Sequence, residues 1–311
     1  MSKECFVPKL DDKSTYYLAP WIVFIPAMLV FAVIPFGGPL NPSELFSSIP
    51  WLAGLFNGQI YPKQIAPLNA GTLAILAISG IGVIGVILAG WSSNNKYSLL
   101  GAIRAASQMI SYEITLGLSL LPMVLIYNTM DLYEMVEKQS TIIAGIFPKW
   151  GLLLSPVCAI LYLTAAFAEN KRVPFDLPEA ESELIAGHFT EYSGMRMGLF
   201  MFSEFIEIVV IAAIFVTFFM GGYNLPFMSS TQLQFPGGLT FSLPHWVAAL
   251  SQPIIFLIKV LIMCCLQILI RWTLPRFRYD QVMRLGWKIL IPIGMVNLII
   301  TVIYLWIRDN L

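Results

Sequence analysis

Seven long apolar runs dominate the sequence and restrict the folds that are open to it. A membrane-spanning helix needs about 20 mostly apolar residues. Runs of this kind occupy residues 18–36, 70–90, 99–127, 150–168, 198–220, 246–270 and 289–306. Only 12% of the residues are charged, about half the share of a soluble domain. The sequence therefore predicts an all-α fold, a polytopic transmembrane helical bundle of about seven spans that forms one membrane domain over residues 1–311.

The distribution of basic residues predicts the orientation of this bundle. With the N-terminus inside, thirteen Lys and Arg residues fall in the inner segments and four in the outer segments. Cytoplasmic segments of membrane proteins carry such an excess of Lys and Arg. We therefore expect a multi-pass protein with a cytoplasmic N-terminus.

Composition excludes several classes of function. The 18 basic and 18 acidic residues cancel, so the sequence has no basic excess for binding nucleic acid. The four cysteines form no C-x-x-C pair, and the two histidines are too few for haem ligation by paired histidines. We expect no metal and no bound redox cofactor in this chain.

Ionisable residues inside the apolar runs are the main candidates for chemistry. Each costs on the order of 2.5–3.5 kcal/mol at the centre of a membrane helix, so it persists only with partners or in a polar cavity. In the third run, Arg104 begins a polar stripe that continues through Gln108, Ser111 and Thr115. Glu113 points to the opposite side of that helix, so it requires a partner on another helix or a proton.

The fifth run contains two acids, Glu204 and Glu207, three residues apart. At this spacing their Cβ atoms lie about 5–6 Å apart, and two carboxylates so close cannot both ionise cheaply. The pair is predicted to share a proton, as a relay requires. An ion pair with a nearby Arg is the structural alternative. Lys259, in the middle of the sixth run, is the expected cationic counterpart.

The connection at residues 169–196 is the most acidic segment of the chain. It reads as a loop followed by a short helix, and Glu179 and Glu183 share one face of that helix while Glu181 points elsewhere. We interpret it as an acidic funnel leading into the membrane, against the alternative of a solvated acidic loop. Arg276 and Arg278 alternate with aromatic residues at the end of the sixth run, a pattern that suits lipid contact or subunit docking.

A glycine motif in the second run, Gly80-Ile-Gly82-Val-Ile-Gly85, matches the dinucleotide-binding pattern. That pattern requires a preceding strand and a later acidic residue, and here it lies within an apolar run. Close helix packing by small residues is the better interpretation.

Five motifs together resemble one known family, the H subunit of bacterial respiratory complex I, the NADH-quinone oxidoreductase (subunit 1 in mitochondria). They are GWSSNNKY at 90–97, RAASQMISYE at 104–113, VPFDLPEAESEL at 173–184, EYSGM at 191–195 and LPRFRYDQ at 274–281. Their order matches that family, and they cover nearly the whole chain. The family also begins with one more transmembrane helix, which implies that the start codon is misassigned or that the chain is a fragment or a shortened version.

The resemblance implies a subunit of proton-translocating NADH:quinone oxidoreductase in the bacterial inner membrane. Its substrate would be a quinone, its partners would be the peripheral arm with flavin and iron–sulfur clusters and the small membrane subunits, and lipids would surround it. The implied proton-path carboxylates are Glu113, Glu169, Glu179, Glu181, Glu183, Glu191 and Glu204. Asp176, Arg196 and Arg104 would lie near the quinone chamber, with Lys259 facing the carboxylates. Glu207 lies outside the matching motifs, so its role rests on spacing alone.

Two alternatives remain open at this point. The equivalent subunit of a membrane-bound hydrogenase or a related dehydrogenase would keep the same fold and most of the motifs. An autonomous ion-coupled transporter would move substrate as a purified chain, whereas the complex I subunit requires its partners. The sequence does not distinguish ubiquinone from menaquinone as the substrate.

Overall fold

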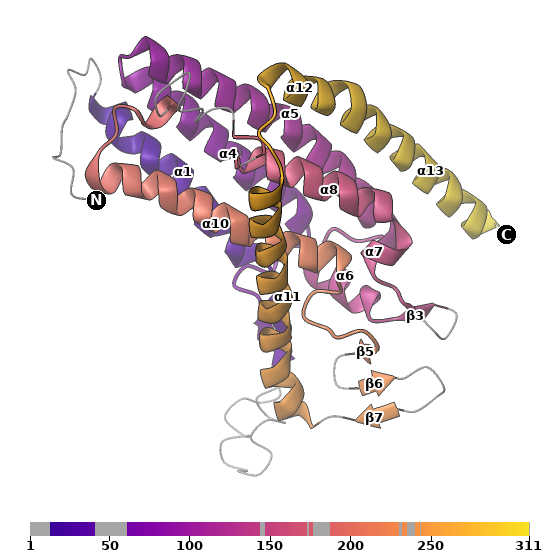
Figure 1. Cartoon of the computed structure of the whole chain (residues 1–311). Helices are drawn as coiled ribbons and strands as arrows, with labels where there is room; N and C mark the ends of the chain where they lie inside the picture. Colours follow the sequence, from indigo (N-terminus) through magenta and orange to yellow (C-terminus); the bar gives the residue numbers. More distant parts are fainter. Residues whose placement is uncertain are drawn as a thin grey trace, which may run out of the picture.

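The structure is a computed structural model that describes residues 13–40, 61–143, 147–172, 174–176, 187–229, 232–234, 240–242 and 244–310. Within these ranges, six helices are long and apolar enough to cross a membrane. Figure 1 shows these helices gathered into one bundle, with α11 crossing the others at an angle. The prediction of an all-α membrane bundle is confirmed.

The long helices begin and end close to the predicted runs. They are α1 (Lys13–Val33), α4 (Gly71–Ser92), α5 (Lys96–Tyr127), α10 (Gly194–Phe219), α11 (His245–Thr273) and α13 (Ile291–Asn310). The seventh span begins earlier than expected, because α12 (Tyr279–Leu285) and a π-helical turn, η2 (Gly286–Leu290), lead directly into α13. Shorter elements are α6 (Leu132–Gln139) and the 3-10 turn η1 (Gly187–Phe189).

The fourth predicted span, at residues 150–168, is divided into two helices. The short α7 (Gly151–Leu154) ends at Ser155, and α8 (Pro156–Glu169) begins with Pro156 as its first residue. Proline lacks an N–H donor and disfavours helical geometry in the residue before it, which explains φ −143° at Ser155. The apolar α8 is shorter than the other spanning helices.

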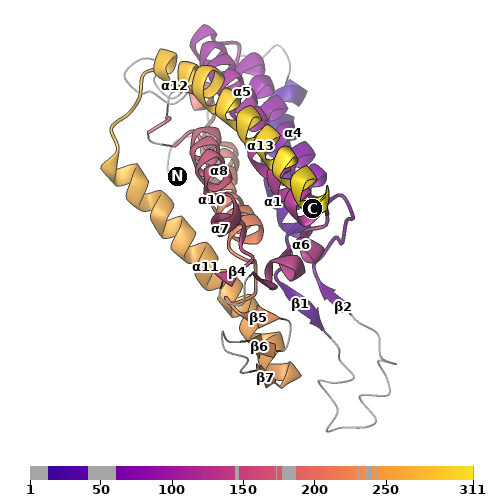
Figure 2. The same cartoon turned by 90° about the vertical axis from the view of Figure 1, so that its right-hand side faces the viewer.

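Short antiparallel strands lie at one end of the bundle, beside α6. They are β1 (Gly37–Leu40), β2 (Tyr61–Lys63), β3 (Ile142–Ile143), β4 (Phe147–Pro148), β5 (Met228–Ser229), β6 (Gln232–Gln234) and β7 (Thr240–Ser242), paired as β1–β2, β3–β4 and β5–β6–β7. Figure 2 shows this strand end opposite the end that carries α12. We refer below to the strand end and the α12 end.

Close helix packing builds the core. The helix α1 packs against α4 and α10, while α5 packs against α4, α8 and α13. The contact between α1 and α4 requires glycine, since a Cβ atom at Gly85 would lie 2.5 Å from Cγ2 of Val23 and 3.2 Å from the carbonyl oxygen of Ala19. The packing interpretation of the glycine motif is confirmed at this position. Gly82 differs, because a Cβ atom there would meet nothing within 4 Å.

We expect Gly85→Ala to lower the thermal unfolding midpoint of the detergent-solubilised protein, because the added methyl group forces α1 away from α4. Overpacking of this kind costs about 1–3 kcal/mol. Gly82→Ala on the same helix is the matched control, and it should keep or raise the midpoint, since alanine favours a helix over glycine. Equal midpoints for both variants would contradict the role assigned to Gly85.

Candidate functional site

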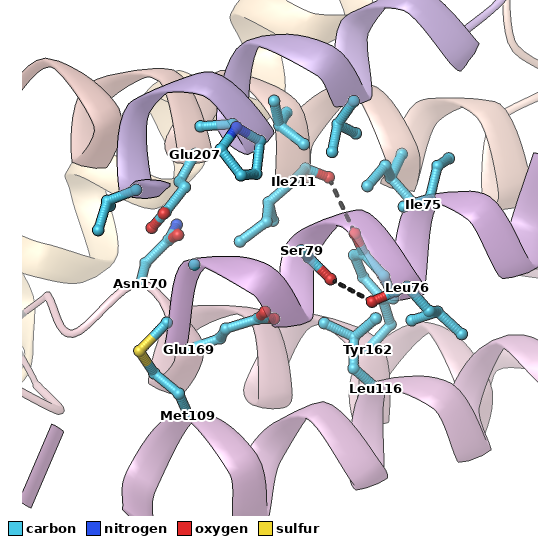
Figure 3. Close-up of a pocket in the computed structure, with 17 residues that line it drawn as sticks. Ile75, Leu76, Ser79, Met109, Leu116, Tyr162, Glu169, Asn170, Glu207 and Ile211 are labelled. Carbon is cyan, nitrogen blue, oxygen red and sulfur yellow. Dashed lines mark hydrogen bonds between the residues drawn. The ribbon is translucent and has the colours of Figure 1, made fainter. Parts of the chain in front are cut away.

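A partly enclosed cavity of about 50 Å³ lies where α1, α4, α5, α8 and α10 meet (Figure 3). Most of its lining is apolar. The polar exceptions are Ser79, Tyr162, Glu169, Asn170 and Glu207. A water molecule needs about 10–15 Å³ of such space together with polar partners, so this cavity has room for a few waters beside two carboxyl groups.

Glu169 reaches the cavity because α8 ends there. The backbone N–H of Asn170 donates to Ala166 O, and Lys171 adopts a left-handed conformation with φ +52°, which stops the helix. A carboxylate at the C-terminal end of a helix is opposed by the helix dipole. Stability of α8 therefore does not account for an acid at this position.

The two acids of α10 face different surroundings. Glu207 lines the cavity, and Figure 3 shows its carboxyl group near the side chain of Asn170. Glu204 is only 5% exposed and lies 3.1 Å from the guanidinium of Arg172, which also lies over the ring of Phe205. The structure thus gives Glu204 the ion pair that the alternative interpretation predicts, while Glu207 shares its space with Glu169.

Glu113 lies on the α5 side of the same region. Its Oε1 atom sits so close to Gly80 of α4 that a Cβ atom there would come within 2.7 Å. Both Glu113 and Glu207 are close enough to Glu169 to interact with it electrostatically. Glu113 therefore belongs to a group of three carboxyl groups, from α5, α8 and α10, and its two neighbours in that group supply no positive charge.

The polar stripe of α5 faces the α12 end rather than the cavity. Gln108 donates from Nε2 to the carbonyls of Ala168 and Phe175, at 2.7 and 2.9 Å. The hydroxyl of Ser111 accepts a hydrogen bond from Nε1 of Trp287 at 3.0 Å. At the start of the stripe, Arg104 lies 5.8 Å from the ring centroid of Tyr279 on α12.

A joint at the α12 end ties residues 174–176 to the connection between α11 and α12. Arg276 and Asp176 form an ion pair at 3.0 Å, and the backbone N–H of Phe277 donates to Pro174 O at 3.0 Å. The rings of Phe175 and Phe277 stack with centroids 5.4 Å apart. Arg276, predicted to dock lipid or a partner, is thus engaged within the chain.

Arg278 differs from Arg276 in its surroundings. Its guanidinium lies 3.2 Å from Asp280, and its side chain is 81% exposed. It remains accessible for the docking role that the sequence predicts.

Glu191 and Arg196 belong to a separate polar cluster near the start of α1. Oε1 of Glu191 accepts a hydrogen bond from Nδ2 of Asn95 at 2.7 Å, and its backbone carbonyl accepts one from the hydroxyl of Tyr16 at 2.7 Å. Tyr16 stacks on Tyr192 at 4.4 Å, and Arg196 lies 5.4 Å from the Tyr16 ring. Burial raises the pKa of Tyr192 to about 12, which keeps its hydroxyl neutral.

The prediction that Lys259 is the counterpart of the acids in α10 is wrong. Its ammonium group donates to the carbonyls of Met220, Gly222 and Asn224, beyond the C-terminal end of α10. Met220 is thirteen residues after Glu207 along the chain, or about 20 Å along a helix axis. Helix carbonyls without intrahelical partners attract cations, a contact that the spacing of side chains cannot reveal.

Three predicted acids, Glu179, Glu181 and Glu183, lie outside the described residues, as does most of the short helix expected there. Sequence reasoning missed Arg172 and Asn170 as site residues. Both closely follow Glu169 at the end of a span, and that position was the available signal. Within the described ranges, no group of three or more His, Cys, Asp and Glu residues is placed to hold a metal ion.

Comparison with known proteins assigns this chain to a family. Residues 1–302 match the family described as NADH dehydrogenase. The chain belongs to this NADH dehydrogenase family. Relatives named as H subunits of NADH-quinone oxidoreductase include one from Geobacter metallireducens, 43% identical over 97% of this chain and 78% of the relative, and one from Cytophaga hutchinsonii, 40% identical over 96% and 79%. The relative of the same name from Leptospira biflexa is 41% identical over 98% of this chain and 79% of the relative.

The family assignment confirms the resemblance predicted from the five motifs. All five contribute to the geometry described above. RAASQMISYE supplies Glu113, GWSSNNKY supplies the Asn95 that binds Glu191 of EYSGM, and VPFDLPEAESEL supplies the Asp176 that binds Arg276 of LPRFRYDQ. Motifs that are far apart in sequence thus meet at the α12 end and in the cluster around Tyr16.

His188 is a buried histidine that should make the stability of this member of the NADH dehydrogenase family depend on pH. It is 1% exposed and packs against Phe189 with ring centroids 3.9 Å apart. Burial lowers the pKa of His188 well below its usual range, and the charge of Lys171 lowers it further. The unfolded chain therefore binds a proton below about pH 6.5 that the folded chain excludes, so stability falls as the pH drops through that value.

We expect His188→Phe to weaken this dependence. Thermal unfolding midpoints of the purified complex, measured between about pH 7.5 and 5.5, should fall less steeply for the variant than for the wild type. Parallel curves for the two proteins would contradict a neutral, buried His188.

We also expect Arg172→Met to destabilise the protein, because it removes the guanidinium that faces the buried Glu204 carboxylate. Breaking a buried ion pair from one side costs about 3–5 kcal/mol. Arg278→Met is the control, since its pair with Asp280 is exposed and worth about 1 kcal/mol or less. Denaturation of the assembled complex measures the loss in free energy of unfolding for each variant. Equal losses for Arg172→Met and Arg278→Met would argue against a structural role for the Arg172 pair.

Proposed function

We propose that this chain is the H subunit of NADH-quinone oxidoreductase, and that its cavity carries protons between the quinone-binding chamber and the proton-translocating membrane arm. The observation that carries the proposal is the cavity itself, where Glu169 and Glu207 share space for water beside Glu113. Acids within membrane helices are costly and mark proton pathways in pumps and transporters. The names of the relatives supply the reaction, electron transfer from NADH to quinone.

The carboxyl groups act in this proposal as successive proton holders. Three of them in one low-dielectric space cannot all be ionised at small cost, so at least one holds a proton. Waters in the cavity would connect Glu169 with Glu207 by hydrogen bonds, with the hydroxyls of Ser79 and Tyr162 in its lining. A proton added at one carboxyl then favours release from another.

The chamber that admits the quinone headgroup would lie at the α12 end. Arg104, Asp176 and Arg196, which the family resemblance assigns to the chamber, lie at or near this end in contact with Tyr279, Arg276 and Tyr16. Glu191 and the acids at 179, 181 and 183 would lead protons from the chamber toward Glu204 and the cavity. Reduction of a quinone to a quinol consumes protons together with electrons, so the charge near this end changes with each turnover.

Partner subunits complete this function. The chain supplies no redox centre in the proposal, so electrons come from flavin and iron–sulfur clusters in the peripheral arm, which would dock at the α12 end. The excess of Lys and Arg in the segments at this end supports a position on the cytoplasmic side of the bacterial inner membrane. The exposed Arg278 would then meet the peripheral arm or anionic lipid.

The test measures proton translocation in the assembled complex with Glu169→Gln and Glu207→Gln. Each change removes an ionisable group and keeps the size of the side chain. We expect proton translocation coupled to quinone reduction to fall at least about tenfold, since positioned acids and bases typically contribute factors of about 10²–10⁴. NADH oxidation by an artificial acceptor in the peripheral arm should persist.

Glu134→Gln is the matched control, because Glu134 is a half-exposed acid that pairs with Lys138 on α6, at the strand end. It should translocate protons at the wild-type rate. Full translocation in both the Glu169 and Glu207 variants would refute the carboxylate path.

A further inference from the structure

The cavity closes toward the strand end through an apolar layer. The last ten residues of α10, Val210–Phe219, lead from the cavity to the end of the helix and include a single polar side chain, Thr217. Its hydroxyl donates to Ala213 O at 2.8 Å within the helix. Phe215 and Phe219 pack against Tyr162 of α8 with ring centroids 5.9 and 5.7 Å away. This stretch of α10 offers no side chain that would support a water file.

Lys259 lies directly beyond this layer. Its Nζ atom donates to Met220 O at 2.7 Å, Gly222 O at 3.0 Å and Asn224 O at 2.6 Å. The residue is 7% exposed, and its ammonium group lies 4.8 Å from the ring centroid of Trp150. The cation is therefore enclosed by backbone carbonyls and an aromatic ring, the two kinds of group that stabilise an ammonium.

The arrangement of acceptors favours the charged form of the side chain. A lysine ammonium has three N–H donors, and three carbonyls receive them here, whereas a neutral amine has only two. The carbonyls converge because Gly221 and Gly222 adopt φ +71° and +51°, a conformation that glycine accepts readily. The turn after α10 thus forms a built site for a fixed positive charge.

A polar cleft lies on the other side of this site. It has a volume of about 340 Å³ at the strand end, and Glu137, Tyr223 and Asn224 contribute to its lining. Asn224 both lines the cleft and binds Lys259 through its carbonyl. The cation therefore stands between a polar cleft on one side and the apolar layer that borders the carboxylate cavity on the other.

We propose that Lys259 closes the carboxylate cavity electrostatically at the strand end, as a fixed cation that prevents protons from crossing to the outer face through this protein. Water that enters the apolar layer transiently would carry hydronium toward the outer face, and a positive charge at the end of the layer repels hydronium, a principle that excludes protons from water channels. For a hydronium about 6 Å from Nζ of Lys259, and an effective dielectric constant of about 20, the repulsion lowers its occupancy roughly a hundredfold. The proposal rests on the proposed function, since a barrier matters only beside a path that carries protons.

The test measures passive proton flux in vesicles that contain the assembled complex, without NADH, after an imposed pH difference. Lys259→Met removes the charge and keeps an unbranched side chain, and we expect the flux to rise at least about tenfold. Lys259→Arg keeps the charge and should remain as tight as the wild type. Lys138→Met is the matched control, because it removes a partly exposed cation at the same end of the bundle and should leave the flux unchanged.

Each outcome decides for or against the barrier. A Lys259→Met complex as tight as the wild type, or a Lys259→Arg complex that leaks as much as Lys259→Met, would overturn it. If Lys259→Met does not assemble, Lys259→Gln is measured in its place, and failure of both neutral variants to assemble would mean that Lys259 serves only to hold the α10 turn.

A double variant separates this proposal from the proposed function. Adding Glu207→Gln to Lys259→Met should suppress the leak, because protons would then lack a carrier in the cavity. A leak that persists in the double variant would show a route outside the cavity and would overturn the barrier. The proposed proton path is tested separately. It is refuted if the Glu169→Gln and Glu207→Gln variants translocate protons normally in the active complex.

Discussion

Carboxyl groups inside an apolar bundle require a means of neutralisation, and that requirement organises this molecule. Glu204 meets it with the guanidinium of Arg172. Glu113, Glu169 and Glu207 instead lie near one another, where they cannot all be ionised at small cost. The short α8 ends at Glu169, and Gly80 has no side chain that would exclude Glu113. Both features bring the carboxyl groups close together.

The close placement of these carboxyl groups accounts for two local features at the end of α8 that do not stabilise the helix. An acid at the C-terminal end of α8 opposes the helix dipole, and Lys171 beside it takes a left-handed conformation that is unusual for a residue other than glycine. Departures from local preference concentrated at one place are typical of functional sites. Around the cavity, Val30, Leu116 and Ile211 supply ordinary apolar packing from the neighbouring helices.

Much of the fold could be predicted from sequence, because hydrophobic run length depends only on local composition. The break at Ser155 follows from Pro156 and was foreseeable in principle. The site was harder to predict. Helical spacing identified Glu204 and Glu207 as a pair, but their actual partners, Arg172 and Glu169, come from another helix and its loop. Lys259 was misassigned because its partners are backbone carbonyls, which leave no mark in a pattern of side chains.

The joint at residues 174–176 has a mechanical consequence. This short segment is fastened to α5 through the Gln108 side chain and to the start of α12 through Arg276 and the backbone of Phe277. It leads directly into the acidic connection on one side and back to Arg172 on the other. The segment is therefore held by three contacts, so a displacement of it would be transmitted to α5, to the start of α12 and, along the chain, to the ion pair between Arg172 and Glu204.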